Sequence, residues 1–250
     1  MYDLQLNIKK TGHGKPLVLL HGWGFDLRVW DSLTDLLNRS GDYELYQVDL
    51  PGFGHSNMMD FATFKQLLLD QIPEQATVIG WSMGGLYATR LAIEAPARIQ
   101  RLINVASSPC FVINPDWPGI SAEVLSAFYR RLSANPAGIL NNFVQMQLNG
   151  CEIPGAMNFI DNLSPVVPDG LRTGLDILSQ WDLRADLHAL RLPVFYLFGR
   201  RDMIVPHATM VAMERDYPQF THKLFNDAAH MPFLSHTDEF VTLLQEWMQC

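Results

Sequence analysis

The stretch Gly80-Trp81-Ser82-Met83-Gly84-Gly85 constrains this chain more than any other, because it places a serine where a strand turns abruptly into a helix. The short apolar run from Ala76 to Ile79 before it is typical of a buried strand. After it, apolar residues recur at helical spacing from Leu86 to Ala95, and Pro96 ends the run. Such a tight turn requires small neighbours, which explains the glycines two residues before and two after Ser82. The pattern predicts a nucleophile elbow, and an ordinary strand-to-helix loop is the alternative.

Strand and helix patterns alternate along most of the chain. Apolar runs predict strands at 4–10, 16–20, 43–48, 76–79, 99–105, 193–198 and 222–225. Helical spacing predicts helices at 26–38, 61–72, 86–95, 207–216 and 238–248. Between Phe111 and Trp181 the alternation stops, and helical patterns at 122–132, 136–148 and 170–181 follow one another. We therefore predict an α/β fold with a mostly parallel central sheet and helices on both faces. Residues 1–110 and 187–250 form its core in this prediction, and residues 111–186 form an inserted helical cap.

Length, charge and cysteine content limit the class of protein. A chain of 250 residues suffices for one sizeable α/β domain with an inserted subdomain. The formal charge of −8 argues against a nucleic-acid partner, because phosphate binding needs clustered Lys and Arg. No apolar run reaches the roughly 18 residues of a membrane span, and the first residues lack a signal-peptide pattern. We expect a cytoplasmic monomer without a membrane partner. Cys110, Cys151 and Cys250 fit neither a disulfide framework nor a metal site, so we expect free thiols and no metal or organic cofactor.

A nucleophilic serine needs a base, and the base needs a group that orients it. In a doubly wound sheet the loops after the strands form the site, so both partners should follow strands. Among eight histidines, His230 fits best, because it follows the last predicted strand. Asp202 follows the preceding strand and gives the order Ser, Asp, His, whereas its rival Asp227 is only three residues from His230. His21 and His55 lie beside glycine-rich turns, where we expect their rings to tie loops together.

Acyl transfer also needs N–H donors for the oxyanion of the tetrahedral intermediate. We expect one donor from the backbone of Met83, which follows the nucleophile at a helix N-terminus. The second is expected from Trp23, which lies between two glycines in the loop after the strand at 16–20. A core aromatic is the alternative interpretation of Trp23. Because serine and not aspartate occupies the nucleophile position, the pattern disfavours dehalogenase and epoxide-hydrolase chemistry.

With these residues assembled, the chain resembles the α/β-hydrolase superfamily and, within it, the pimeloyl-[acyl-carrier protein] methyl ester esterases of biotin synthesis. The resemblance covers essentially the whole chain. Its motifs are Leu19 to Gly24, Val48 to Gly54, Gly80 to Ser82, Val105 to Phe111 and Trp117 to Ile120. The elbow and the His-Gly loop occur in many hydrolases, whereas Ser107 to Phe111 and Trp117 to Ile120 are less common and favour this family.

The resemblance implies an α/β-hydrolase fold and a serine carboxylesterase. It implies hydrolysis, through an acyl-enzyme, of the methyl ester of a pimeloyl chain held on acyl carrier protein. Ser82, Asp202 and His230 match the family's catalytic triad, and Trp23 and Met83 match its oxyanion hole. The substrate-binding residues implied in the same way are Trp23, Ser82, Met83, Phe143, Val144, Gln145, Met146, Gln147 and His230.

One departure from the family concerns the carrier protein. Several cap arginines of the family's best-known member meet the acidic carrier, and the matching positions here are Gly138, Asn142, Gly155 and Phe159. From residue 111 to residue 186 the chain has four basic residues and eight acidic ones, a balance that attracts an acidic carrier poorly.

Several alternatives therefore stay open. Either Arg130, Arg131 and Arg172 form a different patch for the carrier, or carrier binding is weak. The other enzymes considered are a general short-chain carboxylesterase, a thioesterase and a carbon–carbon bond hydrolase. From a different class, a ligand receptor that keeps the hydrolase fold without turnover is the remaining alternative.

Overall fold

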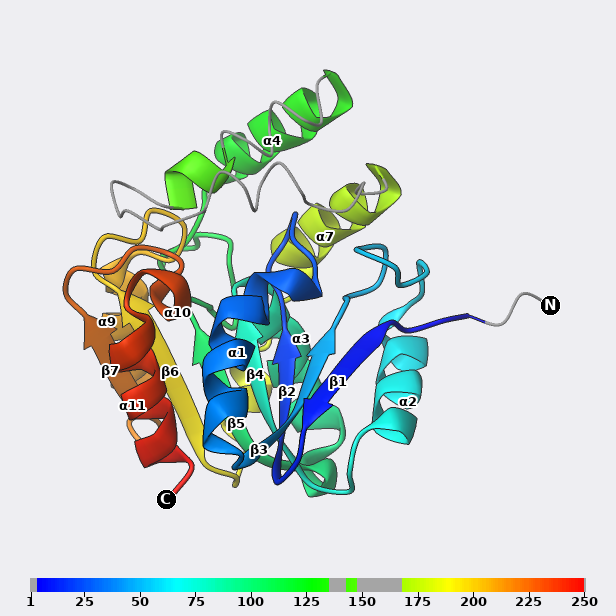
Figure 1. Ribbon diagram of the computed structural model, residues 1–250. Coiled ribbons are helices and arrows are strands. Elements are labelled where there is room, and N and C mark those ends of the chain that lie inside the picture. Colours follow the sequence, from blue (N-terminus) through cyan, green and yellow to red (C-terminus); the bar gives the residue numbers. More distant parts are fainter. Residues whose placement is uncertain (1–3, 135–142, 148–167, 250) are drawn as a thin grey trace.

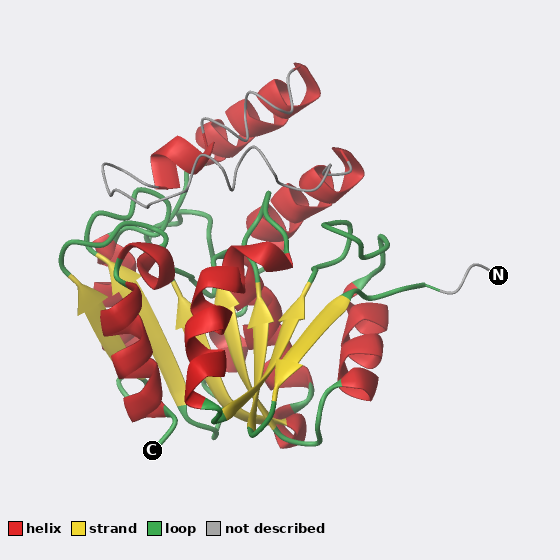
Figure 2. Ribbon diagram, viewed as in Figure 1, coloured by secondary structure: helices red, strands yellow, loops and turns green. Residues whose placement is uncertain are grey.

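The computed structural model describes residues 4–134, 143–147 and 168–249, and these residues are arranged around a central sheet (Figures 1 and 2). Its strands are β1 (Ile8–Gly12), β2 (Lys15–Leu20), β3 (Tyr43–Val48), β4 (Ala76–Trp81), β5 (Ile99–Val105), β6 (Val194–Gly199) and β7 (Thr221–Phe225). They lie in the order β1-β3-β2-β4-β5-β6-β7. β1 pairs antiparallel with β3, and the other neighbouring pairs are parallel. The predicted α/β fold with a mostly parallel sheet is confirmed.

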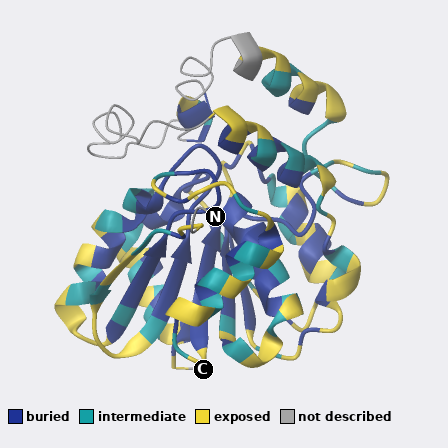
Figure 3. Cartoon of the chain, turned by 90° about the vertical axis from the view of Figure 1, so that its right-hand side faces the viewer, coloured by how far each residue is buried: buried dark blue, intermediate teal, exposed yellow. Residues whose placement is uncertain are grey.

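Successive residues of the central strands point to opposite faces of the sheet and supply two hydrophobic cores. Val18 and Leu20 belong to the core under α2 (Phe61–Gln71), α3 (Met83–Glu94), α8 (Arg184–Leu187) and α9 (His207–Asp216). Leu17 and Leu19 belong to the core under α1 (Asp31–Ser40), α10 (Pro232–Ser235) and α11 (Thr237–Trp247). Figure 3 shows buried strands between helices that each turn a buried stripe inward. Helices therefore cover both faces of the sheet.

Two further helices, α4 (Ala122–Ala134) and α7 (Pro168–Gln180), lie beyond the carboxyl ends of the strands (Figure 1). Residues 143–147 are helical too, and the rest of the helix predicted at 136–148 lies outside the described residues. The segment that follows β5 and the segment that follows α7 are paired with each other. The Leu183 N–H donates to the Pro109 carbonyl at 2.9 Å, and Cys110 forms a β-bridge with Asp182.

The first strand and the first helix differ from their predicted bounds. The strand begins at Ile8 rather than residue 4, because its pairing with β3 runs only from Ile8 opposite Val48 to Gly12 opposite Glu44. The helix predicted to begin at residue 26 starts as a 3₁₀ turn, Leu27–Trp30, and the α-helical part begins at Asp31. The Asp26 side chain caps this 3₁₀ turn. Within the described residues, no helix is both long and apolar enough to cross a membrane.

Candidate active site

Ser82 lies in the sharp turn between β4 and α3, as the sequence predicts. Its φ of 54° and ψ of −121° put a non-glycine residue in a strained backbone region. The turn is held from the neighbouring strand, because the Ser82 N–H donates to the carbonyl of Val105 at 3.0 Å. The Ser82 carbonyl accepts hydrogen bonds from the Gly85 N–H at 2.9 Å and from the Ser107 hydroxyl at 2.8 Å. The geometry is that of a nucleophile elbow.

The glycines around the elbow are required by close approach. A Cβ on Gly80 would lie 2.4 Å from the Gly84 carbonyl oxygen. One on Gly84 would lie 2.2 Å from the carbonyl oxygen of Leu20, at the end of β2. The prediction that Ser82 needs glycine two residues before and two after is therefore confirmed.

His230 and Asp202 are brought together in the loops that follow β7 and β6. The imidazole Nδ1 lies 2.7 Å from Asp202 Oδ2, and both side chains are buried. The other carboxylate oxygen, Oδ1, accepts the backbone N–H groups of Ile204 at 2.8 Å and Val205 at 2.9 Å. This carboxylate orients the ring and favours the tautomer with the proton on Nδ1. The opposite nitrogen, Nε2, is buried and has no hydrogen-bond partner among the described residues.

The rival aspartate, Asp227, lies elsewhere. Its side chain is exposed and forms an ion pair of 2.8 Å with the similarly exposed Arg201. In the described residues, the acid that contacts His230 is Asp202.

The backbone of His230 is also fixed on both sides. Its N–H donates to the carbonyl of Gln147 at 3.2 Å, and its carbonyl accepts the indole N–H of Trp81 at 2.8 Å. Trp81 is the last residue of β4 and directly precedes the elbow serine, so the strand that leads to Ser82 also holds the histidine loop. The side-chain amide of Gln147 is buried, and both its polar atoms are without a hydrogen-bond partner in the described part of the chain.

The two predicted oxyanion donors both lie near the nucleophile in the fold. Met83 is the first residue of α3, and Trp23 follows Gly22 in the loop after β2. A Cβ on Gly22 would lie 3.2 Å from Ser82 Cβ, so this loop passes against the nucleophile. No described residue accepts a hydrogen bond from the backbone N–H of Trp23 or of Met83.

Ser82 opens into a cavity of about 240 Å³ whose walls are mostly apolar. Of the predicted substrate-binding residues, Trp23, Ser82, Phe143 and Met146 line it. Met83, Val144, Gln145, Gln147 and His230 do not, and Gln145 is exposed.

Sequence reasoning missed several wall residues of this cavity. They are contributed by α4, by α7 and by the loop after Asp202, and include Leu125, Phe128, Leu175, Leu178 and Met203. The apolar faces of the two helices were a usable signal for the first four of them.

His21 has the structural role that the sequence predicts. Its Nδ1–H donates to the Gly22 carbonyl at 2.8 Å, and its Nε2 accepts the Leu50 N–H at 2.9 Å. Burial lowers the pKa of His21, against a weaker opposite effect of Asp49. The corresponding prediction for His55 is wrong, because its ring is exposed and its backbone N–H makes the bond, to Asp49.

Cys110 is a buried free thiol, as predicted, and the other two cysteines lie outside the described residues. Within the described ranges, no three His, Cys, Asp or Glu side chains are grouped so as to hold a metal ion.

The parallel sheet, the serine elbow and the buried Asp–His pair define the class of serine hydrolases built on the α/β-hydrolase fold. A sequence model described as "alpha/beta hydrolase fold" matches residues 15–237. The chain is 48% identical over 246 residues to the pimeloyl-[acyl-carrier protein] methyl ester esterase of Legionella pneumophila (strain Corby), covering 98% of this chain and 100% of that protein. The chain therefore belongs to the α/β-hydrolase family and, within it, to the family of pimeloyl-[acyl-carrier protein] methyl ester esterases.

Two further comparisons concern the family and the fold. The protein of the same name from Aliivibrio salmonicida (strain LFI1238) is 39% identical over 248 residues, covering 95% of this chain and 94% of that protein. Among solved structures, an esterase from Exiguobacterium antarcticum has a TM-score of 0.91 at 20% identity, covering 99% of this chain and 96% of that one. At that identity, the structural similarity concerns the fold alone.

Proposed function

We propose that this protein is a serine carboxylesterase that hydrolyses the methyl ester of pimeloyl-[acyl-carrier protein] in biotin synthesis. The observation that carries the proposal is the apolar cavity that opens from Ser82 under α4 and α7. A seven-carbon dicarboxylic chain is mostly methylene, and each buried methylene contributes about 0.8 kcal/mol. The names of the two relatives support the same substrate.

The proposed reaction has two halves. The Ser82 hydroxyl attacks the ester carbonyl while Nε2 of His230 accepts its proton, and the backbone N–H groups of Trp23 and Met83 stabilise the oxyanion. His230 then gives that proton to the departing methoxide, which leaves as methanol. Water attacks the resulting acyl-enzyme with His230 again as base, and the products are a free carboxylate and regenerated Ser82. The Asp202 carboxylate holds the ring in the required tautomer.

We also propose that residues 111–186 form a cap over this site, inserted between core segments 1–110 and 187–250. The contact between Pro109 and Leu183, and the β-bridge between Cys110 and Asp182, support these boundaries. Because these contacts bring the two ends of the segment together, they support an insertion rather than a continuation of the sheet.

The partner in this proposal is the acyl carrier protein that bears the pimeloyl methyl ester. The cap positions Gly138, Asn142, Gly155 and Phe159 lie outside the described residues, so they contribute nothing to this point. We place the enzyme in the cytoplasm, where a free thiol such as that of Cys110 stays reduced.

The substrate itself offers a sharp test, because it carries a methyl ester at one end and a thioester to the carrier at the other. Purified protein is incubated with the methyl ester of pimeloyl-[acyl-carrier protein], and the intact carrier is weighed by mass spectrometry. The proposal expects loss of the methyl group with the chain still attached. Release of unloaded carrier indicates a thioesterase instead, and no reaction contradicts the proposal.

Two controls complete this test. Ser82→Ala should abolish the reaction while the protein keeps its far-ultraviolet circular dichroism spectrum. A gene for the wild-type chain should also restore growth without biotin to a strain lacking its own esterase. If it does not, despite soluble expression and labelling of Ser82 by a fluorophosphonate, the general carboxylesterase is favoured.

A further inference from the structure

The Trp23 side chain is held by α7 and by residues 143–147. Its ring is buried, and its indole N–H donates a hydrogen bond of 2.8 Å to the backbone carbonyl of Leu171 in α7. The ring also meets that of Phe143 edge-on, with centroids 5.0 Å apart. The main chain of the same residue lies in the loop that passes against Ser82. Trp23 thus links α7 directly to the nucleophile.

The helix approaches this loop closely because it presents a glycine there. A Cβ on Gly174 would lie 2.4 Å from Cδ1 of Trp23 and 3.1 Å from the sulfur of Met83. Both residues expected to donate to the oxyanion therefore touch one point on α7. No other residue type fits at position 174 without displacing the indole or the helix.

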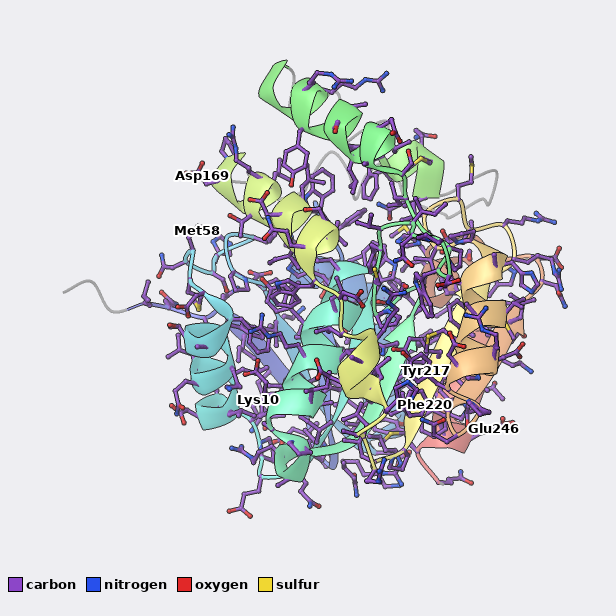
Figure 4. All side chains as sticks on the ribbon, turned by 180° about the vertical axis from the view of Figure 1, so that it is seen from behind. Lys10, Met58, Asp169, Tyr217, Phe220 and Glu246 are labelled. Carbon is purple, nitrogen blue, oxygen red and sulfur yellow. The ribbon has the colours of Figure 1, made fainter. Side chains whose placement is uncertain are left out.

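One turn earlier, a second glycine brings the start of α7 against the core. A Cβ on Gly170 would lie 2.1 Å from the carbonyl oxygen of Gly52, in the loop after β3. Figure 4 shows Met58, from the same loop region, beside Asp169 at the beginning of α7. Gly170 and Gly174 lie four residues apart, so they share a face of the helix. Helix α7 therefore packs closely against the core at two successive turns.

We propose that Gly174 is a positioning residue. In this proposal α7 packs against the Trp23 side chain and thereby fixes the position of the oxyanion donor. This inference rests on the proposed function, because it uses the oxyanion role of Trp23. Trp23 lies between Gly22 and Gly24, and Gly24 has a φ of 81°, so the adjacent main chain has unusual conformational freedom. The contacts of the indole with α7 remove that freedom and fix the direction of the backbone N–H of Trp23. A donor displaced by about 1 Å loses much of its effect on the transition state.

The principal test is Gly174→Ala, assayed with p-nitrophenyl acetate. The acetyl group does not extend into the acyl cavity, so a lower rate cannot result from weaker chain binding. Turnover is expressed per active serine, counted from the burst of p-nitrophenol, which removes any loss from misfolded protein. We expect kcat to fall about tenfold or more while KM stays within about twofold, since removal of a whole oxyanion donor costs on the order of 10²–10³.

A second readout separates positioning from a general structural effect. The affinity for a trifluoromethyl ketone, which forms an oxyanion adduct with the serine, should fall by the same factor as kcat/KM. Trp23→Phe keeps an aromatic ring but lacks the indole N–H, and should change kcat in the same direction. Gln180→Ala, at the exposed end of α7, is the matched control and should leave all three quantities unchanged.

The outcomes are distinct for the two proposals. If the wild-type protein shows no Ser82-dependent hydrolysis, the proposed function fails. If it hydrolyses the ester but Gly174→Ala and Trp23→Phe keep kcat within twofold of wild type, only the positioning role fails. A raised KM with unchanged kcat also overturns the positioning role, because it assigns α7 to substrate binding alone.

Discussion

The hydroxyl of Ser107 donates a hydrogen bond of 2.8 Å to the backbone carbonyl of Ser82. Ser107 follows Ala106, which like Ser82 has a positive φ, in this case 46°. The two strained turns therefore lie side by side at the ends of β4 and β5, and each supports the other. The bond from the Ser82 N–H to Val105 completes this support. The nucleophile is fixed by the neighbouring strand as well as by its own turn.

Ser107→Ala should loosen the elbow. A hydrogen bond of this kind contributes about 1 kcal/mol, so we expect the free energy of unfolding in urea to fall by about that amount. We also expect kcat to fall several-fold, because the serine is then less well aligned. Ser40→Ala is a matched control, since the Ser40 hydroxyl likewise donates to a backbone carbonyl, that of Leu37 at 2.9 Å. A variant with unchanged kcat and unchanged unfolding would show that the elbow does not need Ser107.

Asp202→Asn should nearly abolish hydrolysis and leave the fold intact. The amide oxygen can still accept the N–H groups of Ile204 and Val205, so the loop keeps its conformation. The amide N–H₂ now faces Nδ1 of His230 and favours the tautomer with its proton on Nε2, which cannot accept the serine proton. We expect kcat to fall by about 10⁴, as for the same change in other triads. Asp227→Asn serves as the control, and a comparable loss there would contradict the assignment of Asp202.

The sequence predicts the strands and helices of the core well, because each of them corresponds to a short-range pattern of apolar residues. The strands at 43–48 and 99–105 and the helix at 207–216 have the predicted bounds, because each is an apolar pattern closed by turn or breaker residues. Ser82, Asp202 and His230 can be proposed for the same reason. Each lies in the turn or loop that follows a strand, and the carboxyl ends of parallel strands meet at one edge.

The contacts that complete the site depend on packing, which periodicity does not encode. The hydrogen bond from Trp23 to Leu171 joins residues 148 positions apart. Glycine has a low helix propensity, so the sequence gives no reason for its place at position 174. The reason is the close approach of the helix to the indole of Trp23. The same holds for Met203, whose place in the cavity wall depends on the conformation of the loop after β6.

Stability should fall on acidification because of His21. Burial lowers its pKa in the folded protein below the ordinary value of 6.5, so below that pH the unfolded chain binds a proton that the folded chain does not. Unfolding is then favoured by up to about 1.4 kcal/mol per pH unit, until the folded ring is protonated as well. We expect His21→Gln to show a shallower decrease in unfolding free energy between about pH 6.5 and 5. His55→Gln, at the exposed histidine of the next strand-end loop, should keep the wild-type slope, and an unchanged slope in His21→Gln would contradict the assignment.

The cavity should set the preference for acyl length. With p-nitrophenyl esters of increasing length, kcat/KM should rise by up to about fourfold per methylene until the cavity is full. Leu125→Trp places a larger ring in the wall, so octanoate should lose at least tenfold while acetate changes little. Ser126→Trp, at the next and exposed position of α4, is the control. An equal loss for both ester lengths would show that the acyl chain lies elsewhere.

Three exposed arginines form the patch that we test for recognition of an acidic carrier. Arg130 and Arg131 lie in the last turns of α4, and Arg172 lies near the start of α7. A hydrogen bond of 2.7 Å from Tyr129 to Asp176 joins the two helices beside them. No ion pair links any of the three arginines to another described residue.

Replacing all three arginines by Gln should therefore raise KM for the carrier-bound substrate several-fold at low salt, because exposed charges act mainly on encounter. The difference in KM between the variant and the wild-type protein should disappear as salt rises, because screening weakens the same attraction in the wild-type protein. Hydrolysis of p-nitrophenyl acetate is the internal control and should not change. If the wild-type KM for the carrier substrate is independent of salt, these arginines do not recognise the carrier, and binding depends on the acyl chain alone.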